Sequence, residues 1–205
     1  MVIDLTDFVV NTASTLEQRA ERCIGLLEEW HAGVIRHWAH GAPGWAPEVA
    51  TAVLSRSRLD RQASLCACLR LWLGMPAEQN DGRLILAWAN LGALVEGTLK
   101  FFLSVYAQDY GKTPNTRKGK PLDPDELSFE ALRLFFRDRV WNRADNFWDA
   151  WLLYVQWRRN AIHAYRQAEI GVHAEFLGAI VGYRQLASDL SDRIPWWSSE
   201  DVPSI

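Results

Sequence analysis

The chain has 205 residues, of which 49% are hydrophobic and 23% are charged, a balance that is ordinary for a globular protein with one core. Its formal net charge of −3 excludes a global positive field, so any contact with nucleic acid must come from a local basic patch. The three cysteines form no CxxC pair and no even framework, so we expect them to be small core residues rather than disulfide or metal ligands.

Neither the N-terminal stretch nor the most apolar stretch has the pattern of a secretory signal or of a membrane span. The N-terminal stretch MVIDLTDFVVNTAS carries acidic residues where a secretory signal would carry basic ones. The most apolar stretch, 84–107, is interrupted by Asn90, Glu96 and Lys100, which is not the pattern of a membrane span. We therefore expect a cytoplasmic protein.

Apolar residues recur at helical spacing along the chain, and no convincing run alternates as a strand would. Polar residues suited to capping precede several of these runs, with Ser14 or Thr15 before the first, Asp81 before the third and Ser128 before the fourth. The six predicted helices cover about residues 14–40, 48–73, 81–109, 128–141, 144–164 and 172–194.

The segments between these helices contain glycine, proline and polar residues, and the longest is the polar loop GKTPNTRKGKPLDPDE, residues 111–126. No internal repeat and no shift in composition divides the chain. We therefore predict a single all-α domain over residues 1–205, built as a bundle of about six mostly long, antiparallel helices.

Familiar cofactor and metal motifs are absent. Gly111-Lys112-Thr113 ends like a phosphate-binding loop, but Tyr106 stands where that motif needs glycine, and a helix precedes it instead of a strand. His31, His37 and His40 lie on the first predicted helix without an HExxH pattern, and we interpret them as surface histidines rather than metal ligands. We expect no metal and no cofactor.

The segment QWRRNAIHAYR, residues 156–166, places two arginines on a wide apolar helix face. At about 100° per residue, Arg158 falls on the line of Trp151 and Tyr154, and Arg159 on a neighbouring line. A charge there is costly unless it is paired. In one interpretation the arginine stems cover tryptophans while the charged groups reach water or a carboxylate such as Glu96.

The other interpretation is functional. No acidic residue lies between Asp149 and Glu169, so within this stretch nothing neutralises the arginines. Arginine can grip a phosphate with two parallel hydrogen bonds, and histidine can transfer protons near neutral pH. Together with the amide of Asn160 and the phenol of Tyr165, this set suits an anionic phosphodiester.

Residues 158–165, RRNAIHAY, resemble the Arg-x4-His signature of HEPN domains, and the final x-Tyr resembles the form found in HEPN toxins paired with minimal nucleotidyltransferases. The segment LILAWANLGALVEGTLKFFLSVY, residues 84–106, is also similar to an early bundle helix of HEPN-type proteins. The resemblance implies a metal-independent endoribonuclease that acts as a homodimer, as a toxin or an abortive-infection and antiviral defence effector, with an antitoxin or a nucleotidyltransferase as a further partner.

The chemistry of RNA cleavage agrees with that implication. Attack by a ribose 2′-OH needs a base, an acid and cations around the phosphate, and it makes RNA the substrate because DNA lacks the nucleophile. We assign His163 as base and acid, Arg158 as phosphate clamp and Asn160 as an orienting group, with Arg159, Tyr165 and Glu96 in supporting or regulatory roles. One chain offers a single His163, so a two-fold dimer would supply the second histidine.

Two questions stay open at this point. Arg158 has the signature spacing but lies 140° from His163 on an ideal helix, whereas Arg159 shares its face. We expect Arg158 to be the essential arginine, through fraying of the helix or through an arginine of the partner chain. One alternative to a nuclease is a non-catalytic HEPN-like module that binds RNA or nucleotide or only dimerises. Another is an unrelated helical interaction protein whose aromatic face packs against a partner, which the 11 tryptophans would suit.

A second basic set lies in the polar loop, where Lys112, Arg117, Lys118 and Lys120 occur in a stretch free of acidic residues from 111 to 122. The loop is either a solvated, partly disordered connection or a surface that contacts RNA phosphates independently of sequence. In the second case these four residues would be the RNA-binding cations outside the catalytic segment.

Overall fold

A computed structural model describes residues 16–40, 44–74, 81–141, 147–163, 165 and 167–196. Helices account for 77% of these residues, which confirms the predicted all-α fold. The α-helices are α1 (Leu16–Val34), α2 (Glu48–Arg56), α3 (Leu59–Cys68), α4 (Asp81–Val105), α5 (Ala107–Tyr110), α6 (Phe129–Arg139), α7 (Phe147–Asn160) and α8 (His173–Ser191). Shorter elements are the π-helical turn η2 (Ile35–His40), the 3-10 turns η3 (Leu69–Trp72), η4 (Pro124–Glu126) and η5 (Ala161–His163), and the strands β1 (Thr116–Arg117) and β2 (Lys120–Pro121).

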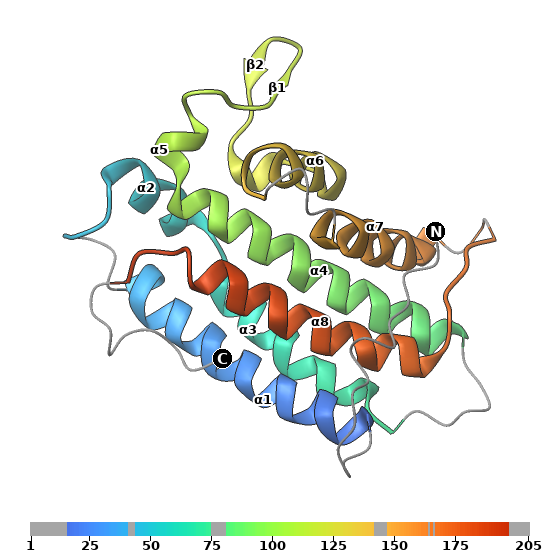
Figure 1. The fold of residues 1–205 in the computed structure, drawn as a ribbon. Coiled ribbons are helices and arrows are strands. Elements are labelled where there is room, and N and C mark those ends of the chain that lie inside the picture. Colours follow the sequence, from blue (N-terminus) through green and yellow to red (C-terminus); the bar gives the residue numbers. More distant parts are fainter. Residues whose placement is uncertain are drawn as a thin grey trace.

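The long helices pack side by side around α4, and the first and last of them, α1 and α8, lie next to each other. Figure 1 shows α1 and α8 lying next to each other, with α4 behind them and α7 alongside α4. α1 and α8 run in the same direction, so the ring of His37 in η2 lies 5.2 Å from that of Trp196, just after α8. Helices that follow each other along the chain, such as α3 and α4 or α7 and α8, run in opposite directions.

The central helix α4 is buried on most of its surface because apolar residues occupy nearly all of its faces. Trp88, Leu91, Leu94, Val95 and Leu99 have no more than a trace of exposed surface. By length and composition alone α4 could cross a membrane, but 61% of its most apolar stretch is covered by the other helices. A helix that is apolar all round is expected at the centre of a bundle, and α4 takes that place.

The helix predicted over residues 48–73 is divided into α2, α3 and η3, so the prediction of one continuous helix there was wrong. Ser57 has an extended backbone (φ −76°, ψ 144°), and its hydroxyl donates to the carbonyl of Val53 at 3.1 Å. Arg58 then pairs with Asp60 through two hydrogen bonds of 2.8 and 2.6 Å. These short polar bonds replace helical ones, because serine and aspartate side chains compete with the backbone for hydrogen bonds.

Other predicted boundaries agree more closely with the structure. The Ser128 hydroxyl accepts a hydrogen bond from the Ala131 amide at 3.2 Å, so the predicted cap of α6 is confirmed. The proposed caps Ser14 and Thr15 lie outside the described residues. All three cysteines are free, and Cys66 is fully buried as expected, whereas Cys23 and Cys68 are half-buried.

Candidate active site

The motif residues lie where α7 ends and the backbone changes its helical type. Within α7, Trp151, Leu152, Val155 and Arg158 form the buried face. The helix packs against α4 and α6, and the Trp151 ring also reaches Gly182 of α8. The α-helix stops at Asn160, and one 3-10 turn, η5, carries the chain through His163. The predicted single helix over 144–164 is therefore shorter than expected, and the change of type falls between the arginines and the histidine.

Arg158 is a buried cation held by two carboxylates from beyond the motif. Only 7% of the residue is exposed, and its Nη2 donates to Glu175 Oε2 at 3.3 Å. Its Nη1 lies 3.6 Å from Glu169 Oε1, which is too long for a hydrogen bond. The guanidinium carbon lies 5.1 Å from the centre of the Tyr154 ring, a cation–π distance.

The connection from η5 to α8 folds closely over this guanidinium. Gly171 has φ of +68°, and a β-carbon at that position would lie 1.8 Å from Glu175 Oε2 and 3.0 Å from Arg158 Nη2. Glu175 Oε2 also accepts the Val172 amide at 3.0 Å, which caps the start of α8. The Trp88 indole of α4 donates to the Ile170 carbonyl at 2.9 Å. A glycine is needed here both for the left-handed backbone and for the close approach.

Arg159 makes the contact that the sequence suggested for one of the two arginines. Its Nη2 donates to Glu96 Oε2 on α4 at 3.0 Å, and its Nη1 to Asn160 Oδ1 at 3.3 Å. Glu96 Oε1 also lies 2.9 Å from the Lys100 ammonium. The arginine stem crosses α4 at Gly92, where a β-carbon would be 2.4 Å from Arg159 Cγ. Its side chain keeps 32% exposure, so it is more accessible than Arg158.

In the functional interpretation no acidic residue nearby in the sequence neutralises the arginines, but in the structure both have carboxylate partners. The other interpretation, in which an arginine reaches a carboxylate such as Glu96, is confirmed for Arg159. The partners come from Glu96, 63 residues upstream of Arg159, and from Glu175, 17 residues downstream of Arg158. One of these could have been anticipated, because antiparallel α7 and α8 bring the end of one next to the acidic first turn of the other. Glu169, Glu175 and Tyr154 are thus site residues that the sequence analysis missed.

His163 and its polar neighbours face outward. Asn160, His163 and Tyr165 are exposed, and Tyr165 entirely so. Among the described residues, none makes a hydrogen bond or an ion pair with the His163 side chain. At about 100° per α-helical and 120° per 3-10 residue, His163 lies on the opposite side from Arg158. One chain therefore brings Arg158 and His163 close in sequence but does not aim them at one point.

Three exposed apolar residues that lie near these polar groups in the sequence are here called the apolar rim. It consists of Trp157, Ile162 and Val172, whose exposed fractions are 65%, 40% and 61%. Each belongs to a different element: α7, η5 and the residue that precedes α8. Large apolar side chains that are exposed to water often mark a surface that another chain covers.

The second basic set forms an ordered hairpin rather than a disordered connection. β1 and β2 pair antiparallel, with Arg117 opposite Lys120. The Tyr110 hydroxyl holds both sides of its base, because it accepts the Asn115 amide at 3.2 Å and donates to the Leu122 carbonyl at 2.9 Å. The predicted loop thus contains two short strands that helical periodicity could not reveal.

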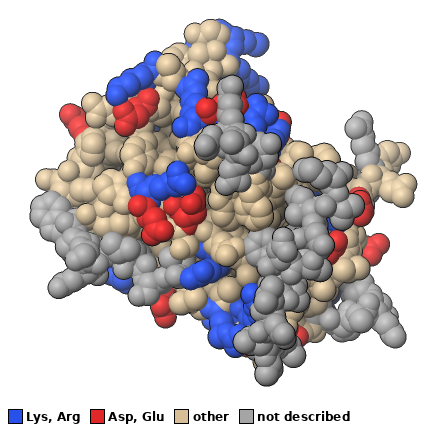
Figure 2. Space-filling view, viewed as in Figure 1, with Lys and Arg blue, Asp and Glu red and all other residues tan. Residues whose placement is uncertain are grey.

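The structure does not bring this hairpin together with the motif. The hairpin projects beyond α5 and the C-terminal end of α4, whereas Arg159 contacts α4 at Gly92 and Glu96, in its first two thirds (Figure 1). Lys112 differs from the other three loop cations, because its ammonium forms an ion pair with Asp109 at 2.6 Å. Figure 2 shows the basic side chains at the top of the molecule, where the hairpin lies.

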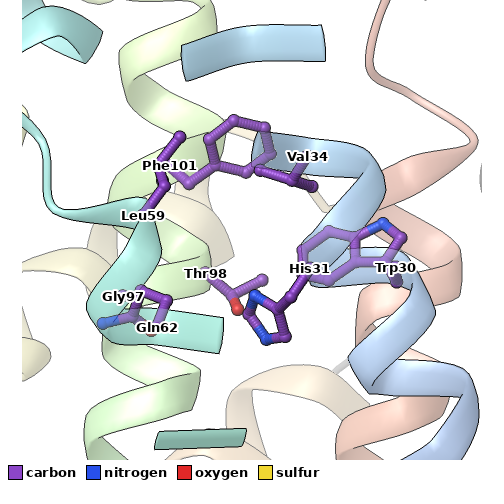
Figure 3. A pocket seen from close by; sticks show the side chains of 8 residues that line it. All are labelled: Trp30, His31, Val34, Leu59, Gln62, Gly97, Thr98 and Phe101. Atoms are coloured by element: carbon purple, nitrogen blue, oxygen red, sulfur yellow. The ribbon is translucent and has the colours of Figure 1, made fainter. Parts of the chain in front are cut away.

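His31 and His37 are buried, so their interpretation as surface histidines was wrong. His31 Nε2 lies 2.9 Å from the Tyr183 hydroxyl of α8, which lies 2.9 Å from the Thr98 hydroxyl of α4. Figure 3 shows His31 and Thr98 facing each other beside a cavity of about 10 Å³, far too small for a substrate. Burial lowers the pKa of His31 to about 4 and raises that of Tyr183 well above its ordinary value.

The described residues contain no candidate metal site, and the comparisons with known proteins found no relative. Within the described ranges, no three histidine, cysteine or acidic side chains gather as metal ligands would. Comparison of the chain with protein-family models, with curated proteins and with solved structures found no match. The proposed function therefore rests on the residues of the site and their geometry.

Proposed function

We propose that this chain is a metal-independent HEPN-type endoribonuclease that cleaves RNA by 2′-OH attack. It would act as a homodimer in the cytoplasm, as a toxin or an antiviral defence effector. The observation that supports this most is an exposed His163, with which no described residue pairs, only a few residues after two arginines anchored to α4 and α8. A free proton carrier next to fixed cations is what phosphoryl transfer from RNA requires.

The proposed reaction is a transesterification that consumes no water. The ribose 2′-oxygen forms a bond to the adjacent phosphorus while the bond from phosphorus to the following 5′-oxygen breaks. A neutral His163 takes the proton of the 2′-OH, and a protonated His163 of the second chain gives a proton to the departing 5′-oxygen. The products are a 2′,3′-cyclic phosphate and a free 5′-OH. The arginines stabilise the negative charge that builds on the phosphate oxygens in the transition state.

The proposed reaction calls for a homodimer, and the placement of these groups supports it. His163 points away from Arg158 of its own chain, and each chain has one such histidine at this position. A two-fold axis near η5 would bring two histidines together and would cover the apolar rim at the same time. Asn160 would orient the phosphate or ribose, and the fully exposed Tyr165 would be open to a modifying nucleotidyltransferase or to an antitoxin.

Arg158 needs one change before it can hold a phosphate. Its Nη1 is buried and makes no hydrogen bond, since Glu169 lies 3.6 Å away and its carboxylate side chain is 89% exposed. Glu175, in contrast, is tied to the start of α8 by the Val172 amide. An incoming phosphate would therefore replace Glu169 and leave Glu175 in place.

The second candidate function is a non-catalytic HEPN-like module for dimerisation or for binding RNA or nucleotide. The pairing of both arginines with carboxylates favours this candidate, because ion pairs that join α7 to α4 and α8 are sufficient to explain why the arginines are there. This candidate needs no proton carrier, so it predicts that nothing depends on the His163 imidazole.

Purified protein incubated with total RNA in excess EDTA separates the two candidates. We expect cleavage products with 2′,3′-cyclic phosphate ends, and at least a hundredfold loss of rate in His163→Ala, in line with the usual contribution of about 10²–10⁴ from general acid–base catalysis. Gln167→Ala, an exposed neutral change in the same connection, is the matched control and should cleave normally. Intact RNA with the wild type, or full activity in His163→Ala, would assign the second candidate.

A further inference from the structure

The hairpin β1–β2 combines a strained backbone with a concentration of positive charge. Lys118 has φ of +53° and Gly119 φ of +78°, so both central residues of the turn have the left-handed backbone of a type I′ hairpin. Asparagine or glycine ordinarily occupies the first of these positions, and a lysine there costs about 1 kcal/mol. A cation kept at the tip against that cost indicates a role for its charge.

The cations of the hairpin differ from most others in the described chain because no carboxylate pairs with them. Arg56, Arg58, Arg70, Lys100, Lys112, Arg133, Arg137, Arg158, Arg159 and Arg193 each form an ion pair. Arg117, Lys118 and Lys120, by contrast, are exposed and have no ion pair with any described residue. Three unpaired charges within four residues concentrate the positive field at one place on a chain of net charge −3.

These side chains line a shallow hollow that is large enough for a nucleotide. Its volume is about 400 Å³, and its walls also include Pro121, Leu122 and Glu126. Glu126 is fixed by its own role in the chain, because its carboxylate accepts the Asp123 amide at 2.9 Å and caps η4. The hollow thus carries three positive groups against one negative group.

We infer that this hollow is an anion-binding site, separate from the motif at the end of α7, that holds the phosphate backbone of a single nucleic-acid strand. Nucleic acid fits better than a membrane surface, because no large apolar side chain of the described residues 111–126 is exposed for insertion between lipids. Backbone contacts of this type are independent of base sequence.

The position of the site has a consequence for the substrate, and this step rests on the proposed function. From Glu96, which binds Arg159, to Tyr110, which binds the hairpin, the chain advances 14 residues, or roughly 20 Å at 1.5 Å per helical residue. At about 3.4 Å per nucleotide of a helical strand, this corresponds to roughly six nucleotides. The preferred substrate is therefore an RNA strand longer than about six nucleotides, with short oligomers reaching the motif alone.

Binding of oligodeoxythymidylate tests the site without relying on cleavage, since DNA lacks the 2′-OH. We expect the wild type to bind a 20-nucleotide strand, and the triple variant Arg117→Ser, Lys118→Gly, Lys120→Ser to bind it roughly ten- to a hundredfold more weakly at about 0.1 M salt. The slope of log K against log salt should fall by about 2, since each lost contact to a single strand removes about 0.7. Glycine at 118 keeps the turn, and unchanged circular dichroism would verify the fold.

The controls separate this site from the alternatives. Arg58→Ser removes an exposed but paired cation elsewhere and should leave affinity and salt slope unchanged. Equal binding by the triple variant and the wild type would overturn the inference, as would binding of anionic-lipid vesicles in place of the oligonucleotide. In cleavage assays the triple variant should raise KM for a 20-nucleotide RNA and leave that for a four-nucleotide RNA unchanged. Absence of any cleavage together with hairpin-dependent binding would reject the nuclease and retain the site.

Discussion

Arg158 has the least exposed of the arginine side chains that form ion pairs, and its environment explains why its charge is tolerated. Removing a guanidinium from water costs several kcal/mol, which a carboxylate and a polar contact must offset. Glu175 supplies the charge at 3.3 Å and the Tyr154 ring supplies a polarisable face. Arg158 therefore stabilises the junction of α7 and α8 whether or not it also binds phosphate. The stability of any Arg158 variant must be measured together with its activity.

Lysine substitutions distinguish the two arginines while keeping the charge. We expect Arg158→Lys to lower kcat/KM for RNA by about 10²-fold, because lysine lacks the planar fork, and Arg159→Lys to lower it by less than about tenfold. Thermal unfolding of both variants shows whether the loss exceeds what instability explains. A larger loss from Arg159→Lys would show that the phosphate clamp is Arg159, the residue that pairs with Glu96.

The Glu169→Gln variant completes that test. An exposed ion pair is worth about 0.2–1 kcal/mol, so removing the competing carboxylate should lower KM roughly two- to fivefold. The unfolding temperature should fall by no more than about 4 °C. Glu175→Gln should behave differently and destabilise the fold, because that carboxylate also caps α8. An unchanged KM in Glu169→Gln would mean that the phosphate does not bind where Glu169 lies.

His31 makes stability depend on pH in a definite window. The unfolded chain binds a proton at this histidine below a pKa of about 6.5, whereas in the fold its pKa is lowered to about 4. Stability is thus complete above pH 6.5 and falls by up to about 3 kcal/mol as the pH drops from 6.5 to 4. Urea unfolding between pH 7 and pH 5 should show this loss, and His31→Gln should flatten it. An equal slope in both proteins would assign the pH dependence to other groups.

At the level of elements, local chemistry made some features predictable and left others hidden. The capping serine at 128 acts within three residues, and it was predicted correctly. The break at Ser57 is also local, but serine is tolerated in helices, so its bond to Val53 could not be foreseen. The left-handed turn at Lys118 was hidden because lysine carries no turn signal of its own.

The candidate site was predictable as a set of residues but not as an arrangement. Helical spacing placed Arg158 and Arg159 on the apolar face. In the structure the Arg159 stem lies on α4 at Gly92, and the buried Arg158 guanidinium reaches Glu175 of α8. Of the carboxylates near Arg158, Glu175 follows from the antiparallel order of the two helices, whereas Glu169 lies in a connection that no periodicity describes. The change from α to 3-10 backbone after Asn160 likewise depends on packing, and it decides which way His163 faces.

For the molecule as a whole, the apolar rim predicts a second chain. We expect light scattering at micromolar concentration to give twice the chain mass, and Trp157→Glu to give a monomer with unchanged helix content and no RNA cleavage. Val49→Glu on α2 is the matched control, because Val49 is similarly exposed, at 51%, and lies away from α7. An active monomeric wild type would contradict the dimer.

The central position of α4 has one more consequence, for the lengths that this chain can tolerate. The motif is fixed to α4 at Gly92 and Glu96, and the hairpin is fixed beyond its C-terminal end through Tyr110. Adding or deleting one residue between these points would rotate one attachment relative to the other by about 100° and shift it by about 1.5 Å. It would also turn a buried face of α4 toward water. Insertions and deletions should therefore be rejected in α4, because this helix sets the angular relation between the two surfaces.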